Sequence, residues 1–176
     1  MNTETIYLDY AATTPVDGRV LDTMLPFFRE NFGNTSSVHW YGQQAEAALE
    51  TARETLAAGL NCQPGEVIFT SCGSESDNLA LRGAALAARN RTSADQILIT
   101  PVEHHAVSRT AQQLARLHGF EVQYLGVDEF GRVDPAEAAG RITGRTALVS
   151  VIYANNEIGT INPIGEIGAI CRERGV

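Results

Sequence analysis

Lysine is absent from this sequence of 176 residues, and all 13 of its basic residues are arginines. A Walker A loop needs a lysine to contact the phosphates of a nucleotide, so the P-loop NTPases are excluded. The G-x-G-x-x-G fingerprint of dinucleotide-binding folds is also absent. The G-x-S-x-G elbow of serine hydrolases is missing as well, because Glu75 stands where the nucleophilic serine would be.

Cysteine is scarce and widely spaced. Cys62, Cys72 and Cys171 form no C-x-x-C pair, and their odd number is not that of a disulfide framework. His104 and His105 are adjacent, so they point in different directions on a helix or a strand, and no H-E-x-x-H pattern occurs. We therefore expect the cysteines to be small buried hydrophobes, and we expect no metal site.

The sequence has no apolar run long enough to cross a bilayer, since stretches such as residues 147–154 are too short. Residues 1–4 carry neither the basic nor the apolar region of a signal peptide. The net charge of −8 argues against nucleic acid or an anionic membrane as the main partner. We expect a cytoplasmic globular protein with no membrane partner and no direct nucleic-acid partner.

Apolar periodicity predicts alternating strands and helices. The predicted strands are residues 66–70, 96–100, 121–127 and 146–154, which are short β-branched or aromatic runs. The predicted helices are residues 20–32, 43–58, 75–88, 104–117 and 164–174, with a short one from Pro135 after the N-cap residue Asp134. This order gives right-handed crossovers between parallel strands. We therefore expect an α/β fold, a three-layer sandwich with a mostly parallel sheet.

The residues that follow the predicted strands are the candidate site, because ligands bind beyond the carboxyl ends of parallel strands. Gly73 and Ser74 lie in a small-residue turn that follows the first strand and opens a helix. Backbone N–H groups at such a terminus favour an anion, and Gly73 permits close backbone approach. The alternative is a capping box, with serine as the cap and Glu75 or Asp77 in the first turn. The spacing alone does not choose between a phosphate site and a cap.

Two further strand ends carry polar residues. His104 follows the second strand, where an imidazole can stack on an aromatic ligand or move a proton; the alternative is a helix cap or a surface residue. Asn155 and Asn156 follow the last strand, where amides suit a polar ligand edge; the alternative is a turn with a left-handed asparagine. Together, Ser74, His104 and Asn156 predict one shared cleft at one edge of the sheet.

Five ordered blocks of the sequence resemble those of a known enzyme family. They are residues 7–15 (YLDYAATTP), Phe32-Gly33-Asn34 with Ser36, Ser37 and His39, Thr70-Ser71 with residues 75–78 (ESDN), Glu103-His104, and residues 155–159 (NNEIG). These blocks are similar to those of the cysteine desulfurases of the nitrogen-fixation and housekeeping iron–sulfur type. That family is a class V member of the pyridoxal 5′-phosphate (PLP)-dependent aminotransferase superfamily. The resemblance spans the whole chain and implies the PLP-dependent transferase-like fold (fold type I).

The resemblance implies a sulfurtransferase that converts L-cysteine to L-alanine and passes on the sulfur as an enzyme persulfide, for iron–sulfur cluster assembly or tRNA thiolation. It implies that Gly73 and Ser74 bind the phosphate of PLP. It implies that His104 stacks on the pyridine ring and is catalytic through proton transfer, and that Asn156 binds the 3-hydroxyl region of the cofactor or the substrate. The implied partners are L-cysteine, a second copy of the chain in a homodimer, and a sulfur-acceptor or iron–sulfur scaffold protein.

The absence of lysine means that the chain lacks one residue that this enzyme family needs. PLP enzymes of this kind need a lysine for a Schiff base and an acid opposite the pyridine nitrogen. By the resemblance, both groups follow residue 176, as do the sulfur-accepting cysteine and the substrate-binding arginine. We therefore expect a truncated chain that is inactive by itself, with residues 1–15 as an N-terminal segment and residues 16–176 as the N-terminal part of the large PLP-binding domain. The alternatives are another class V enzyme, such as a selenocysteine lyase or a sulfinate desulfinase, and a noncatalytic binding module.

Overall fold

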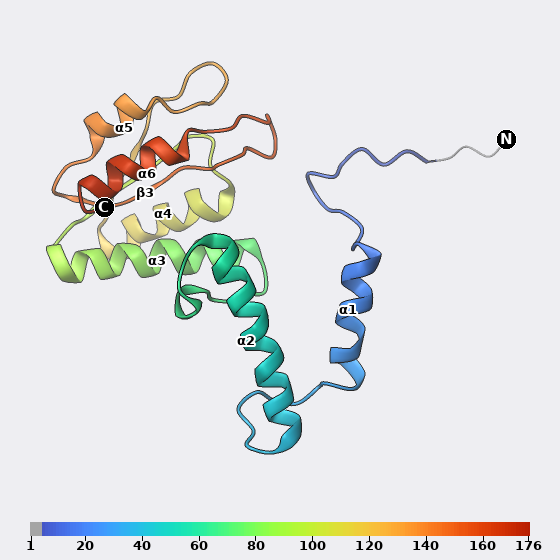
Figure 1. The fold of residues 1–176 in the computed structure, drawn as a ribbon. Helices are drawn as coiled ribbons and strands as arrows, with labels where there is room; N and C mark the ends of the chain where they lie inside the picture. The colour runs from blue at the N-terminus through green and yellow to red at the C-terminus, as the bar shows by residue number, and fades with distance from the viewer. Residues whose placement is uncertain (1–4) are drawn as a thin grey trace. The chain divides into compact units, whose positions relative to one another are not determined.

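The computed structural model describes residues 5–176, which divide into two compact units, one ending at Phe69 and one running from Thr70 to Val176. None of the helices in this described part of the chain is long and apolar enough to cross a membrane. The elements in chain order (Figure 1) are α1 (Gly18–Arg29), α2 (Trp40–Leu60), the 3-10 turn η1 (Pro64–Glu66), α3 (Gly73–Thr92), β1 (Gln96–Ile99), α4 (His105–His118), β2 (Glu121–Tyr124), α5 (Pro135–Arg141), β3 (Thr146–Ser150) and α6 (Ile164–Glu173).

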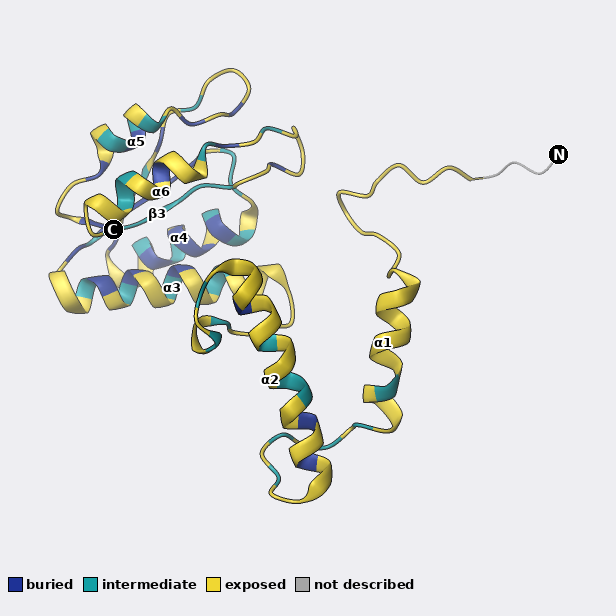
Figure 2. Ribbon diagram, in the orientation of Figure 1, coloured by how far each residue is buried: buried dark blue, intermediate teal, exposed yellow. Residues whose placement is uncertain are grey.

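The second unit is a three-layer α/β sandwich. Its central strand β1 pairs in parallel with β2 on one side and with β3 on the other. Side chains alternate across the sheet, so Ile97 and Ile99 pack with α3 and α4, whereas Leu98 packs on the opposite face with α5 and α6. Figure 2 shows the buried residues of these helices in dark blue. The expected α/β sandwich with a parallel sheet is therefore confirmed.

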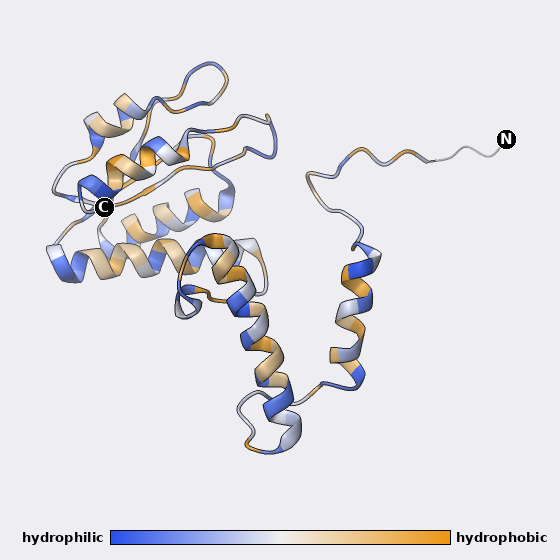
Figure 3. Ribbon diagram, viewed as in Figure 1, coloured by the Kyte–Doolittle hydropathy of each residue, from blue (hydrophilic) through white to orange (hydrophobic). Residues whose placement is uncertain are grey.

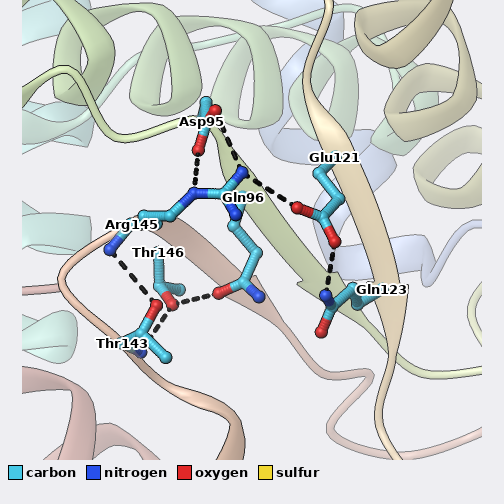
Figure 4. Close-up of polar contacts among 7 residues, drawn as sticks. All are labelled: Asp95, Gln96, Glu121, Gln123, Thr143, Arg145 and Thr146. Carbon is cyan, nitrogen blue, oxygen red and sulfur yellow. Dashed lines mark hydrogen bonds and ion pairs between the residues drawn. The ribbon is translucent and has the colours of Figure 1, made fainter.

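One arginine joins the amino ends of the three strands (Figure 4). Arg145, which precedes β3, donates hydrogen bonds to both carboxylate oxygens of Asp95, at 2.9 and 3.1 Å, and to Glu121 at 2.9 Å. Asp95 directly precedes β1, and Glu121 is the first residue of β2. The hydrogen bond from Arg145 lowers the pKa of Asp95. These contacts hold the end of the sheet that lies opposite the candidate site.

The strand predicted at residues 66–70 is wrong. The backbone is extended at Val67, but the segment forms no ladder with any strand in the described part of the chain. A strand is defined by pairing with a neighbour, which an apolar run cannot supply by itself. Ile68 and Phe69 are accordingly 68% and 44% exposed. The other three predicted strands are confirmed, each over fewer residues than predicted.

In the first unit, helix α1 exposes its apolar side chains. The helix starts after Asp17, whose carboxylate accepts a hydrogen bond from the N–H of Arg19 at 2.9 Å. Leu21, Leu25 and Phe28 are 45%, 47% and 70% exposed. Figure 3 shows the apolar residues of this helix in orange.

Helix α2, also in the first unit, begins with a histidine cap and a close backbone contact. The Nδ1 atom of His39 accepts a hydrogen bond from the N–H of Gly42 at 3.3 Å. A Cβ at Gly33 would overlap the carbonyl of Tyr41, and one at Gly42 would overlap the carbonyl of Ser37. The block around residues 32–39 therefore shapes the turn that enters α2.

Candidate functional site

The turn at the start of α3 leaves amide groups free. The N-cap residue Cys72 is extended and makes no capping hydrogen bond through its side chain. Glu75 turns back and accepts hydrogen bonds from the hydroxyl and the amide of Ser71, at 2.5 and 2.7 Å, and these bonds lower the pKa of Glu75. A serine cap, the alternative to an anion site, is therefore not formed. Within residues 5–176, the N–H groups of Gly73 and Ser74 have no acceptor.

The space over this turn is open. A Cβ added at Gly73 would meet no atom within 4 Å, and the side chain of Ser74 is exposed. Free amides at a helix N-terminus attract an anion, because their N–H groups and the helix dipole point toward it. With a serine hydroxyl beside them, these donors fit the phosphate group of PLP.

His104 caps helix α4. Its Nδ1 atom accepts a hydrogen bond from the N–H of Ala106 at 3.1 Å, and its carbonyl accepts from Val107 at 2.9 Å. A neutral imidazole that accepts through Nδ1 carries its proton on Nε2. The capping role considered above is therefore real. It uses one ring nitrogen and leaves Nε2 without a partner in the described part of the chain.

Ser74 and His104 line the same pocket, which has a volume of about 500 Å³. The other residues of this pocket come from α3 and α4, and they include Arg109 and Arg116. Two guanidinium groups and a helix N-terminus give the pocket positive potential, which suits an anion. His104 also lines a second pocket, formed mainly by apolar residues of α3 and β3. The imidazole thus borders both a polar and an apolar space.

Asn156 is not grouped with these residues. It is exposed, lines neither pocket, and donates a hydrogen bond to Glu157 at 3.4 Å. Asn155, in contrast, is only 8% exposed, accepts from the N–H groups of Glu157 and Ile158 at 2.8 and 3.1 Å, and donates to the carbonyl of Val102 at 2.9 Å. Neither asparagine is left-handed. The structure therefore gives Asn155 a turn-forming role and leaves the Asn156 side chain at the surface.

Asn78 belongs to the pocket and was not predicted from the sequence. Its side-chain N–H donates to the carbonyl of Ser74 at 2.9 Å, and its side-chain oxygen accepts from the hydroxyl of Thr110 at 2.8 Å. The spacing of four residues places Asn78 on the same helix face as Ser74, which is a usable sequence signal. Thr110 lies 32 residues further on, and no local pattern connects it to Asn78.

The expectation of buried cysteines is wrong. Cys72 is exposed because the N-cap position, with φ of −165° and ψ of 168°, lies outside the packed part of α3. Cys62 and Cys171 are half-buried, and burial raises the pKa of Cys171. Across residues 5–176, no three histidine, cysteine or acidic side chains gather as a metal site would require.

Comparison with known proteins gives a consistent family. The model of the family "Aminotransferase class-V" matches residues 6–176. A curated relative, cysteine desulfurase IscS of Clostridium botulinum (strain Kyoto / Type A2), is 48% identical over 97% of this chain, and the chain spans 42% of that relative. The solved structure of a NifS-like protein has a TM-score of 0.88 and 41% identity, covering 96% of this chain and 45% of the other. That of "SspA in complex with cysteine" has a TM-score of 0.88 and 35% identity, covering 98% and 49%.

Proposed function

The chain belongs to the aminotransferase class-V family, and we propose that it is the N-terminal part of a PLP-dependent cysteine desulfurase. In this proposal, the longer protein converts L-cysteine to L-alanine and transfers the sulfur as an enzyme persulfide. The names of the relatives support the reaction, and the SspA complex supports cysteine as the substrate. Residues 16–176 then belong to the large PLP-binding domain, preceded by a segment of residues 1–15.

The observation that carries the proposal is the pocket shared by Ser74 and His104. We assign the phosphate of PLP to the free amides of Gly73 and Ser74 and to the Ser74 hydroxyl. The guanidinium groups of Arg109 and Arg116 add positive charge to the same pocket. An anion held by these groups lies beside an imidazole, which is the combination that a phosphorylated aromatic cofactor requires.

Bound PLP would supply an electron sink for breaking the bond between carbon and sulfur. We assign His104 to stacking on its pyridine ring and to proton transfer at Nε2, because Nδ1 is held by the N–H of Ala106. We assign Asn156, rather than Asn155, to hydrogen bonding near the 3-hydroxyl group. Asn155 is committed to the turn, whereas Asn156 has only one long contact and is free to rotate.

The residues present do not complete an active site in this proposal. With no lysine in the sequence, the chain has no side chain for the Schiff base, and we propose that it is inactive by itself. We further propose that the longer protein is a cytoplasmic homodimer that passes sulfur to an acceptor or scaffold protein, for iron–sulfur cluster assembly or tRNA thiolation. The IscS names of the relatives support the first of these two uses.

The experiment that tests the cofactor site uses this chain and pyridoxine 5′-phosphate. This compound has no aldehyde, so it cannot react with the α-amino group, and it reports on the noncovalent site alone. We expect saturable binding by ³¹P NMR titration, with much weaker binding of pyridoxine, which has no phosphate. Equal binding of the two compounds would contradict the assigned phosphate site.

A second experiment tests the reaction on the longer protein that contains this chain. The protein is loaded with PLP and given L-cysteine, L-selenocysteine or L-cysteine sulfinate in separate reactions, and alanine release is measured. We expect alanine and a protein persulfide from L-cysteine at a higher kcat/KM than from the other two. A preference for either of the others would assign the protein to a different class V activity, and no alanine from any of them would favour a binding module.

A further inference from the structure

The segment that joins β1 to α4, residues 100–104, is anchored to the neighbouring strand by a glutamate. The carboxylate of Glu103 accepts a hydrogen bond from the hydroxyl of Thr100 at 2.8 Å and one from the N–H of Ile152 at 2.7 Å, both at Oε1. Its Oε2 atom accepts from the hydroxyl of Ser150 at 3.3 Å. Thr100 follows β1, whereas Ser150 ends β3 and Ile152 follows it. Glu103 therefore bridges the carboxyl ends of two adjacent strands.

A second side chain holds the same segment. The carboxamide of Asn155, which is only 8% exposed, donates to the carbonyl of Val102 at 2.9 Å. Thr100 itself is only 1% exposed. Two consecutive residues of the segment are therefore held in place. Asn155 holds the carbonyl of Val102, and the carboxylate of Glu103 binds the ends of both strands. His104 is the next residue.

We propose that Glu103 is a positioning residue for His104. By fixing the start of α4 against the end of β3, Glu103 keeps Nδ1 of His104 on the N–H of Ala106 and thereby keeps the proton on Nε2. The His104 side chain is exposed, so its orientation depends on how the backbone at the start of α4 is held. That the ring then faces a cofactor rests on the proposed function. The anchoring of His104 by Glu103 does not rest on it.

The hydrogen-bond geometry predicts which variants of Glu103 keep residues 100–104 anchored to β3. In Glu103→Gln, the amide oxygen replaces Oε1 and keeps the donors from Thr100 and Ile152, and the hydroxyl of Ser150 can rotate to accept from the amide nitrogen. In Glu103→Asp, the shorter side chain cannot reach both strands. In Glu103→Ala, every one of these contacts is lost, and the N–H of Ile152 is left without its acceptor.

The test uses the 176-residue chain and NMR of the His104 ring, with the signals assigned by comparison with His104→Asn. In the wild type and in Glu103→Gln, we expect ¹⁵N shifts of a single Nε2-protonated tautomer. In Glu103→Ala and Glu103→Asp, we expect a mixture of tautomers, together with amide exchange at Ala106 that is about tenfold faster. Unchanged ring shifts in Glu103→Ala would overturn the proposal.

Two controls separate positioning from loss of stability. Glu129→Ala removes an exposed glutamate and should leave the His104 signals unchanged. Val133→Ala creates a cavity in the core cluster that packs against α5 and α6. It therefore lowers the stability of the fold without removing a contact of Glu103. If Val133→Ala changes the tautomer as much as Glu103→Ala does, the proposal is wrong.

If Glu103→Ala does not fold, Thr100→Val provides the same test, because it removes one donor and keeps the carboxylate. It should shift the ring signals in the same direction by a smaller amount, and unchanged signals would overturn the proposal. Binding of pyridoxine 5′-phosphate is measured separately. If pyridoxine 5′-phosphate does not bind, the proposed function is wrong, whereas the proposed role of Glu103 is unaffected.

Discussion

The hydroxyl of Thr110 donates a hydrogen bond to the side-chain oxygen of Asn78, at 2.8 Å, and this bond joins α4 to α3. The amide group of Asn78 also donates to the carbonyl of Ser74 at 2.9 Å. Asn78 therefore connects the free helix terminus at Ser74 to the helix that His104 caps. The two parts of the candidate site are held together by a polar contact as well as by the apolar core beneath it.

Asn78→Ala should lower the free energy of unfolding by about 1–2 kcal/mol, because it leaves the buried hydroxyl of Thr110 without its acceptor. Urea denaturation measures this effect. The double variant Asn78→Ala with Thr110→Val should lose less than the sum of the two single variants. Asn90→Ala, at an exposed position of the same helix, is the matched control. Strict additivity in the double variant would show that the two side chains are not coupled.

Ser74→Ala should weaken the binding of pyridoxine 5′-phosphate to this chain by about 1–2 kcal/mol, since one hydrogen bond to a charged group is lost and the backbone donors remain. The ³¹P NMR titration described above measures the change. Ser108→Ala is the control, because Ser108 lies on α4 and lines neither pocket. Binding that is the same in Ser74→Ala and the wild type would remove the hydroxyl from the phosphate site.

In the longer PLP-loaded protein, His104→Ala should lower cysteine turnover about 10²-fold or more, with a smaller loss of bound cofactor. Because His104 also caps α4, the alanine variant alone would confound the two roles. His104→Asn keeps an acceptor for the cap and removes the imidazole, so it should recover helix stability but not turnover. His118→Ala, at the other end of α4, should keep wild-type turnover. Recovery of turnover in His104→Asn would limit His104 to capping.

Features set by neighbouring residues could be predicted from the sequence. The start of α5 follows the N-cap residue Asp134, as predicted. Helix α4 ends at Gly119, whose φ of 68° is the left-handed conformation in which glycine commonly ends a helix. The strand predicted at residues 66–70 is wrong, because an apolar run does not reveal whether a partner strand lies beside it. Of the three residues predicted to share one cleft, Ser74 and His104 line the same pocket, whereas Asn156 does not. The contact from Glu103 to Ile152 spans 49 residues, and no local pattern predicts it.

Acidification should remove the stabilising contact between Asp95 and Arg145. The hydrogen bond from Arg145 lowers the pKa of Asp95 in the folded chain, so this contact stabilises the fold at pH values above the unfolded pKa of about 3.9. The stabilisation is lost as the pH falls through the lower, folded pKa. Asp95→Asn should therefore have a lower Tm than the wild type at pH 7, and the difference should shrink as the pH falls below about 4.

Thermal unfolding followed by circular dichroism between pH 7 and pH 2.5 measures this difference at each pH. Because the side chains of Arg145 and Asp95 are 60% and 38% exposed, added salt should also reduce the difference in Tm. Arg145→Met is the matched variant. Since it removes the donor that lowers the Asp95 pKa, a further Asp95→Asn change should have little effect on Tm at any pH. A Tm difference between wild type and Asp95→Asn that stays constant down to pH 2.5 would show that the ionised carboxylate of Asp95 is not what joins the amino ends of β1 and β3.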